Sequence, residues 1–97
     1  MASSGPTSSG DLLAGVLADV SRRTGSARVL FPLWRQVVGE TLAGASAPLR
    51  WQGSTLVIGC SSAAWATELT RQRTECLRKL QLRLGKKMVE SLVFEAA

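Results

Sequence analysis

Histidine and tyrosine are both absent from this sequence of 97 residues. Without histidine, neither a Ser-His-Asp nor a Cys-His nucleophile can be assembled, and no histidine ligand is available to a metal. The seven acidic residues are scattered, with no close pair that suggests an acid/base dyad or a Mg²⁺ site. Neither of the glycine-rich phosphate loops, GxGxxG and GxxxxGKS/T, occurs. We therefore expect a protein that is not an enzyme and that uses no cofactor, metal or small-molecule substrate.

Long apolar runs and paired cysteines are missing as well. No segment approaches the roughly 18 apolar residues that span a bilayer, and the first residues lack the basic flank and apolar stretch of a signal peptide. Cys60 and Cys76 lack CxxC spacing, and each lies within an apolar pattern, which predicts buried, reduced thiols. These features predict a cytoplasmic protein with no membrane partner.

The composition that remains is typical of one small domain. Hydrophobic residues make up 45% of the chain and charged residues 20%, which indicates a globular fold. Residues 1–10 are rich in Ser, Gly and Pro and predict a flexible tail, which leaves residues 11–97 for the domain. The chain carries 12 Lys and Arg against 7 Asp and Glu. This balance favours a polyanionic partner, such as nucleic acid or an acidic protein face.

Two helices are predicted in the first half of the chain. Apolar residues recur at helical spacing from Asp11 to just before Gly25, and Asp11 lies at the positive end of that helix dipole. A second helix is predicted from Pro32, which suits a first turn, to Gly44. The residues expected to face the core are Leu12, Leu13, Val16, Leu17 and Val20 in the first helix, and Trp34, Val37, Val38 and Leu42 in the second.

A β-hairpin is predicted next. Two short strands, Ala47 to Trp51 and Thr55 to Cys60, flank Gln52-Gly53-Ser54, whose length and composition fit a hairpin turn. Pro48 pushes the first strand toward a sheet edge or a strand start. The face of the second strand that can pack on helices is expected to hold Leu56, Ile58 and Cys60.

A long third helix and a final strand complete the predicted order. The helix runs from the N-cap candidates Ser61 and Ser62 to about Leu84. The strand covers Met88 to Glu95 and can pair parallel to a neighbour, because a long helix precedes it. The fold class is therefore α+β, in the order helix, helix, strand, strand, helix, strand, with the helices on one face of a three-stranded sheet. The third helix is expected to pack through Trp65, Leu69, Cys76, Leu80 and Leu84.

Positive charge concentrates on the third helix and the loop after it, which hold seven of the 12 cations. Two interpretations stay open: a ridge that contacts phosphates, or a solvated helix face whose late cations complement the helix dipole. Leu82 projects from the same outer face and is a candidate contact for a protein partner. The candidate nucleic-acid-binding residues are Arg71, Arg78, Lys79, Arg83, Lys86 and Lys87.

The three tryptophans are interpreted mainly as core residues. Trp34 and Trp65 lie on the apolar stripes of helices and are predicted to pack. Trp51 ends a strand beside the hairpin turn, where it could fill the core with Leu49 or stack on a base. Packing is the favoured interpretation. Trp51 is nevertheless kept, with Leu82, as one of two candidate partner-binding residues.

Several motifs resemble those of one family. They are Leu33-Trp34-Arg35-Gln36-Val37-Val38-Gly39-Glu40, then Pro48-Leu49, then Gly53-Ser54-Thr55-Leu56-Val57-Ile58, then Ser62-Ala63-Ala64-Trp65-Ala66-Thr67-Glu68-Leu69, and finally Leu84-Gly85 before the last strand. Together they resemble the DciA family over almost all of residues 11–95.

The resemblance implies a KH-like domain, which agrees with the order of elements predicted from periodicity. It also implies association with the DnaB-type replicative helicase, help in loading that helicase on DNA, a nucleoid-associated location, and contact with single-stranded or fork-like DNA. It implies no catalytic residues. Longer members often carry a basic extension, so we expect this chain to be either a minimal member or a fragment. The alternative is a general nucleic-acid-binding module without a helicase role. No GxxG loop is visible, which disfavours RNA binding in the usual KH manner.

Overall fold

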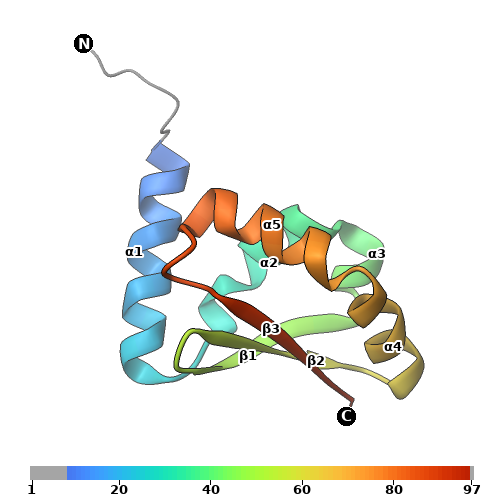
Figure 1. Cartoon of the computed structure of the whole chain (residues 1–97). Helices are drawn as coiled ribbons and strands as arrows, with labels where there is room; N and C mark the ends of the chain where they lie inside the picture. Colours follow the sequence, from blue (N-terminus) through green and yellow to red (C-terminus); the bar gives the residue numbers. More distant parts are fainter. Residues whose placement is uncertain (1–8, 97) are drawn as a thin grey trace.

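Helices cover one face of a three-stranded sheet in the computed structural model, which describes residues 9–96 (Figure 1). The expected α+β class and order of elements are confirmed. The elements are α1 (Ser9–Thr24), the 3-10 helix η1 (Arg28–Leu30), α2 (Phe31–Val38), α3 (Glu40–Ala43), β1 (Ser46–Gln52), β2 (Thr55–Cys60), α4 (Ala63–Arg71), α5 (Arg73–Leu84) and β3 (Ser91–Ala96). Of the tail predicted at residues 1–10, residues 1–8 lie outside the described part, and residues 9 and 10 are already helical.

The sheet has the strand order β1-β2-β3. The predicted hairpin is confirmed, because β1 and β2 pair antiparallel on either side of Gly53-Ser54. The final strand pairs parallel to β2, with Leu56 opposite Leu92 and Ile58 opposite Phe94. It begins at Ser91, three residues later than expected, because residues 86–88 form a turn.

Strand β1 is an edge strand, as Pro48 predicted. The pairing register shifts between Pro48 and Arg50, so Leu49 is the extra residue of a β-bulge. The Leu49 side chain lies over Gly59, where an added Cβ would come within 2.6 Å of Leu49 Cδ1. The loop after α1 covers part of this edge: the Ala27 amide donates to the Leu49 carbonyl and the Trp51 amide donates to the Gly25 carbonyl, both across 3.0 Å.

The core lies between the sheet and the helices. Leu56, Ile58 and Leu92 are at most 1% exposed and supply the sheet side. Trp34 from α2 is equally buried, and its ring lies 6.3 Å from that of Phe94. Its indole N–H donates to the Ser46 hydroxyl, which donates in turn to the Leu42 carbonyl. The core role predicted for Trp34 is confirmed.

The second helix is interrupted at Gly39. This residue has φ 90° and ψ 170°, a conformation that side chains essentially exclude. The chain therefore leaves α2 at Val38 and re-enters a helical turn at Glu40. Periodicity alone predicted one helix through to Gly44, because Val38 and Leu42 both pack against the core on either side of the break.

The third helix is also divided. The Ser62 hydroxyl accepts a hydrogen bond from the Trp65 amide, which confirms Ser62 as the N-cap of α4. The helical path then ends at Arg71, Gln72 turns the chain, and α5 starts at Arg73. Figure 1 shows α4 at one end of the sheet and α5 running across it toward α1. The prediction of one long helix was therefore wrong at Gln72.

Helix α1 turns a different face to the core from the one predicted. The residues that it buries are small: Ala14 is 9% exposed, Ala18 0% and Ser21 2%. Small side chains allow the α1 backbone to approach its neighbours closely. The larger residues of the predicted stripe point outward, since the exposed fractions are 59% for Leu13, 59% for Val16 and 50% for Val20. Leu17, at the margin of the two faces, packs against the core, and the side chain of Leu12 lies outside what the structure describes.

Candidate functional site

Ion pairing divides the predicted basic residues into two groups. Arg78 Nη2 lies 2.6 Å from Glu75 Oε2, and Arg71 Nη1 lies 3.6 Å from Glu68 Oε1. The Arg78 hydrogen bond, with a smaller contribution from Lys79, lowers the pKa of the Glu75 carboxyl. Arg71 and Arg78 are thus exposed as predicted, but each already has an acidic partner.

The second group consists of the other four predicted residues, Lys79, Arg83, Lys86 and Lys87. Lys79, Lys86 and Lys87 are exposed, and no hydrogen bond or ion pair of their side chains is formed within the described part of the chain. Arg83 is half-buried and donates to Gln36 Oε1 across 3.0 Å, which holds α5 to α2. The excess positive charge of the predicted set therefore lies on α5 and the turn after it.

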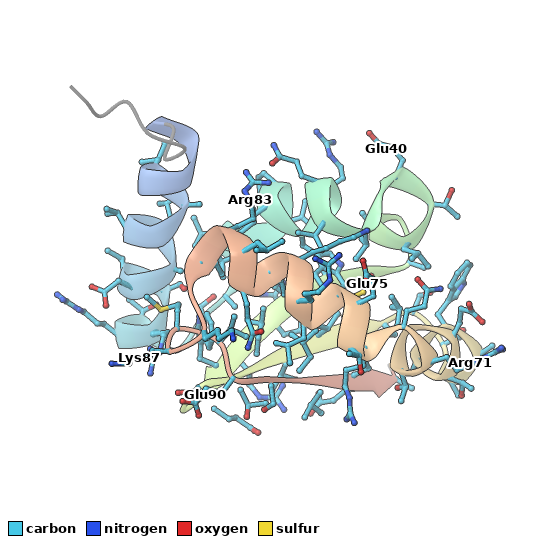
Figure 2. All side chains as sticks on the ribbon, turned by 45° about the horizontal axis from the view of Figure 1, so that its top comes forward. Glu40, Arg71, Glu75, Arg83, Lys87 and Glu90 are labelled. Carbon is cyan, nitrogen blue, oxygen red and sulfur yellow. The ribbon has the colours of Figure 1, made fainter. Side chains whose placement is uncertain are left out.

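The predicted ridge is not continuous. Figure 2 shows Arg71 on α4 at one end of the molecule and Lys87 at the other, near the end of α1, with Arg83 on α5 beside α2. One continuous helix was predicted to carry these residues, but the break at Gln72 puts Arg71 on a different helix from Lys79 and Arg83.

A further cation joins Lys86 and Lys87 from a distant part of the sequence. Arg22, in the last turn of α1, donates to the sulfur of Met88 across 3.5 Å. Its guanidinium carbon lies 5.6 Å from the centroid of the Trp51 ring. We call Arg22, Lys86 and Lys87 the basic corner. Sequence reasoning missed Arg22, because it lies outside the basic stretch, and only the packing of α1 beside the turn brings it there.

The two predicted partner-binding residues differ in their exposure to solvent. Leu82 is 71% exposed, as expected, and borders a depression of about 200 Å³ between α2 and α5. Trp51 is only 7% exposed, and its indole N–H donates to the Ser21 hydroxyl across 2.7 Å. The structure thus places Trp51 in the core, as the favoured interpretation had it, and we remove it from the set of surface contacts.

The remaining features to consider in the described residues are the two cysteines, possible metal-binding groups and possible membrane spans. Cys60 and Cys76 are free thiols, as predicted, and burial raises the pKa of both. No group of three or more Cys, Asp and Glu side chains lies close enough to hold a metal ion in residues 9–96. Within the same residues, no helix has the length and apolar character needed to cross a membrane.

The connection between α4 and α5 bears on nucleic-acid recognition. A KH domain clamps backbone nucleotides with a GxxG loop. Here Gln72 alone joins the two helices, so the residues between them cannot form such a loop. Contact with a nucleic acid through the described surface would therefore depend on cations and not on a loop of this kind.

Comparison with known proteins gives three matches. The family model described as "Dna[CI] antecedent, DciA" matches residues 8–94. A UPF0232 protein from Mycolicibacterium smegmatis is 33% identical over 86 residues, which cover 84% of this chain and 44% of the relative. A UPF0232 protein from Rhodococcus jostii is 36% identical over 59 residues, which cover 61% of this chain and 31% of the relative. The chain thus spans less than half the length of these relatives.

Proposed function

The chain belongs to the DciA family, and we propose that it is a non-enzymatic adaptor of bacterial DNA replication. In this proposal it associates with the DnaB-type replicative helicase and assists the loading of that helicase on single-stranded or fork-like DNA. The observation that carries the proposal is the family match, which covers every helix and strand from α1 to β3 except the last residues of β3.

The surface supports this proposal in two ways. Lys79, Lys86 and Lys87 form no ion pair within the described residues, so they remain available to phosphates. Leu82 is 71% exposed on the same helix as Lys79, and an apolar residue of this kind suits a protein contact. One face can thus offer charge to DNA and apolar contact to a protein.

A second candidate function is a general nucleic-acid-binding module without a helicase role. The basic corner favours it, because Arg22 contacts Met88 and thereby lies beside the turn that carries Lys86 and Lys87. This function predicts salt-sensitive binding to many sequences and needs no protein partner.

One binding experiment separates the two functions. The chain is mixed with the purified replicative helicase of its own organism, with and without single-stranded DNA, at two salt concentrations. The adaptor function predicts a complex with the helicase that persists at the higher salt, because part of the contact is apolar. Salt-sensitive DNA binding without any helicase complex would contradict the adaptor function and support the general module.

A matched pair of variants assigns the contacts. Leu82→Gln removes the exposed apolar side chain of α5, whereas Val93→Gln removes an apolar side chain that is 42% exposed on β3. The adaptor function predicts that Leu82→Gln weakens helicase binding and that Val93→Gln does not. Equal binding of both variants would exclude Leu82 from the contact.

A further inference from the structure

The outward face of α1 adjoins a groove. Leu13 and Leu17 of α1 form one wall, and Val29, Pro32 and Leu33 form the other. We call this the α1–α2 groove, and its volume is about 220 Å³. Although it lies beside the core, Leu13 is 59% exposed and Val29 is 48% exposed, so apolar surface remains open to solvent on both walls.

The groove adjoins the depression beside Leu82. Gln36 and Arg83 line both hollows, and their 3.0 Å hydrogen bond forms the boundary between them. Figure 2, which brings this side of the molecule forward, shows Arg83 at the end of α5 between the ribbons of α1 and α2. One surface therefore runs from α1 across α2 to α5, with exposed leucines at both ends.

The charge of this surface has one sign among the described residues. Lys79 and Arg83 line it, and none of the residues that line either hollow is acidic. Arg28, next to Val29, is exposed, and its guanidinium forms no ion pair within residues 9–96. An occupant that complements this surface must carry apolar side chains toward the groove and carboxylates toward its rim.

The walls of the groove also limit the secondary structure that an occupant can have. They are formed by α1, η1, α2 and α5, whose amides and carbonyls are largely used within the helices. The groove therefore offers no free strand edge to which an extended peptide could add. A helix satisfies its own backbone hydrogen bonds, so it can present an apolar stripe without needing such an edge.

We propose that the α1–α2 groove receives an acidic amphipathic helix of the partner protein. The apolar stripe of that helix would lie between Leu13 and Val29, and its carboxylates would face Arg28 and Lys79. This inference rests on the proposed helicase association, because it takes the helicase as the protein that supplies the helix.

The test is a comparison of binding to the purified helicase by three forms of the full chain. They are the wild type, the double variant Leu13→Gln with Val29→Gln, and the control Val93→Gln. All three substitutions affect exposed side chains, so the fold should be retained, and far-ultraviolet circular dichroism with a thermal melt verifies it. We expect the double variant to bind at least about tenfold more weakly and the control to bind like the wild type.

Each outcome bears on a different claim. If the wild type binds and the double variant binds equally well, the groove is not the contact, whereas the helicase association stands. If the wild type does not bind the helicase at all, the proposed function itself fails and the groove loses its proposed partner.

A crosslink identifies the occupant directly. A photoreactive amino acid at position 29 is activated in the complex, and the attached peptide is sequenced by mass spectrometry. The expected peptide belongs to a helix of the helicase whose apolar residues recur every three or four positions, with acidic residues on the flanks of that stripe. A crosslink to a second copy of this chain, or to a helicase segment without acidic residues, would overturn the proposal.

Discussion

The indole N–H of Trp51 donates to the Ser21 hydroxyl across 2.7 Å and so ties the end of α1 to strand β1. Both side chains are buried. The Ser21 hydroxyl donates in turn to the Ala18 carbonyl across 2.8 Å, so it is satisfied both as donor and as acceptor. A small polar residue thus allows the helix and the strand to approach closely, with no unpaired polar atom between them.

Replacement of Ser21 by alanine should destabilise the protein. The substitution leaves the Trp51 N–H buried without an acceptor, which costs about 1 to 3 kcal/mol of unfolding free energy. Chemical denaturation measures the change. Ser61→Ala, at an exposed serine whose hydroxyl has no hydrogen-bond partner in the described residues, is the control and should change stability by less than about 0.5 kcal/mol. Equal effects of the two variants would show that the hydrogen bond does not hold α1.

Two glycine-to-alanine substitutions should have opposite effects. Gly39 has φ 90°, so Gly39→Ala strains the backbone between α2 and α3 and should destabilise by about 1 to 3 kcal/mol. Gly15 lies within α1 with nothing within 4 Å of an added Cβ, so Gly15→Ala should stabilise by about 0.5 to 1 kcal/mol. Thermal melts of the two variants compare them. A stabilising Gly39→Ala would contradict the break described between these helices.

If the basic corner contacts DNA, its lysines should determine the salt dependence. Replacement of Lys86 and Lys87 by glutamine should reduce the slope of log affinity against log salt by about 1.4 on single-stranded DNA, since each phosphate contact there contributes about 0.7. Replacement of Arg71 and Arg78 by glutamine should reduce it less, because both already pair with glutamates. Fluorescence anisotropy with labelled single-stranded DNA measures the slopes. An equal reduction by both pairs would show that the ion pairs do not restrict Arg71 and Arg78.

The Glu75–Arg78 pair should weaken in acid. The pKa of Glu75 is lowered in the folded protein, mainly by the Arg78 hydrogen bond, so the carboxylate favours folding above its unfolded pKa of about 4.3. That contribution is lost as pH falls through the lower, folded value. Arg78→Gln should return the pKa of Glu75 toward its ordinary value, as measured by a carbon-13 NMR titration. Lys79→Gln should raise it less, because Lys79 contributes less to the shift. The reverse order would identify Lys79 as the main partner.

The spacing of apolar residues predicted the elements well but not the bends between them. Hairpin, final strand and helices were all located, because alternation in strands and the 3.6-residue period of helices are local properties of sequence. The breaks at Gly39 and Gln72 were missed for a physical reason. Residues on both sides of each break, such as Val38 and Leu42, still pack on the core, so the apolar period continues through the bend.

The orientation of α1 shows a second limit. Its largest apolar residues predicted the buried face, yet Ala14, Ala18 and Ser21 lie there instead. These small residues are buried because they let α1 approach the neighbouring elements closely. The local sequence pattern contains no information about that approach. Conversely, the exposure of Leu13 could not be predicted from the sequence, because a large apolar side chain on a helical stripe is expected to be buried. Arg22 was missed for a related reason, because its place in the basic corner depends on how α1 packs beside the turn at residues 86–88.

The parallel pairing of β3 with β2 also determines when the sheet can be completed during synthesis. The middle strand β2 can form its hairpin with β1 early, but its other neighbour consists of residues 91–96. Until these residues have left the ribosome, one edge of β2 stays open and the core lacks Leu92 and Phe94. The β1–β2 hairpin is therefore incomplete as a sheet until β3 is available. Any delay in the synthesis of residues 91–96 would prolong the period in which that edge can pair with another chain.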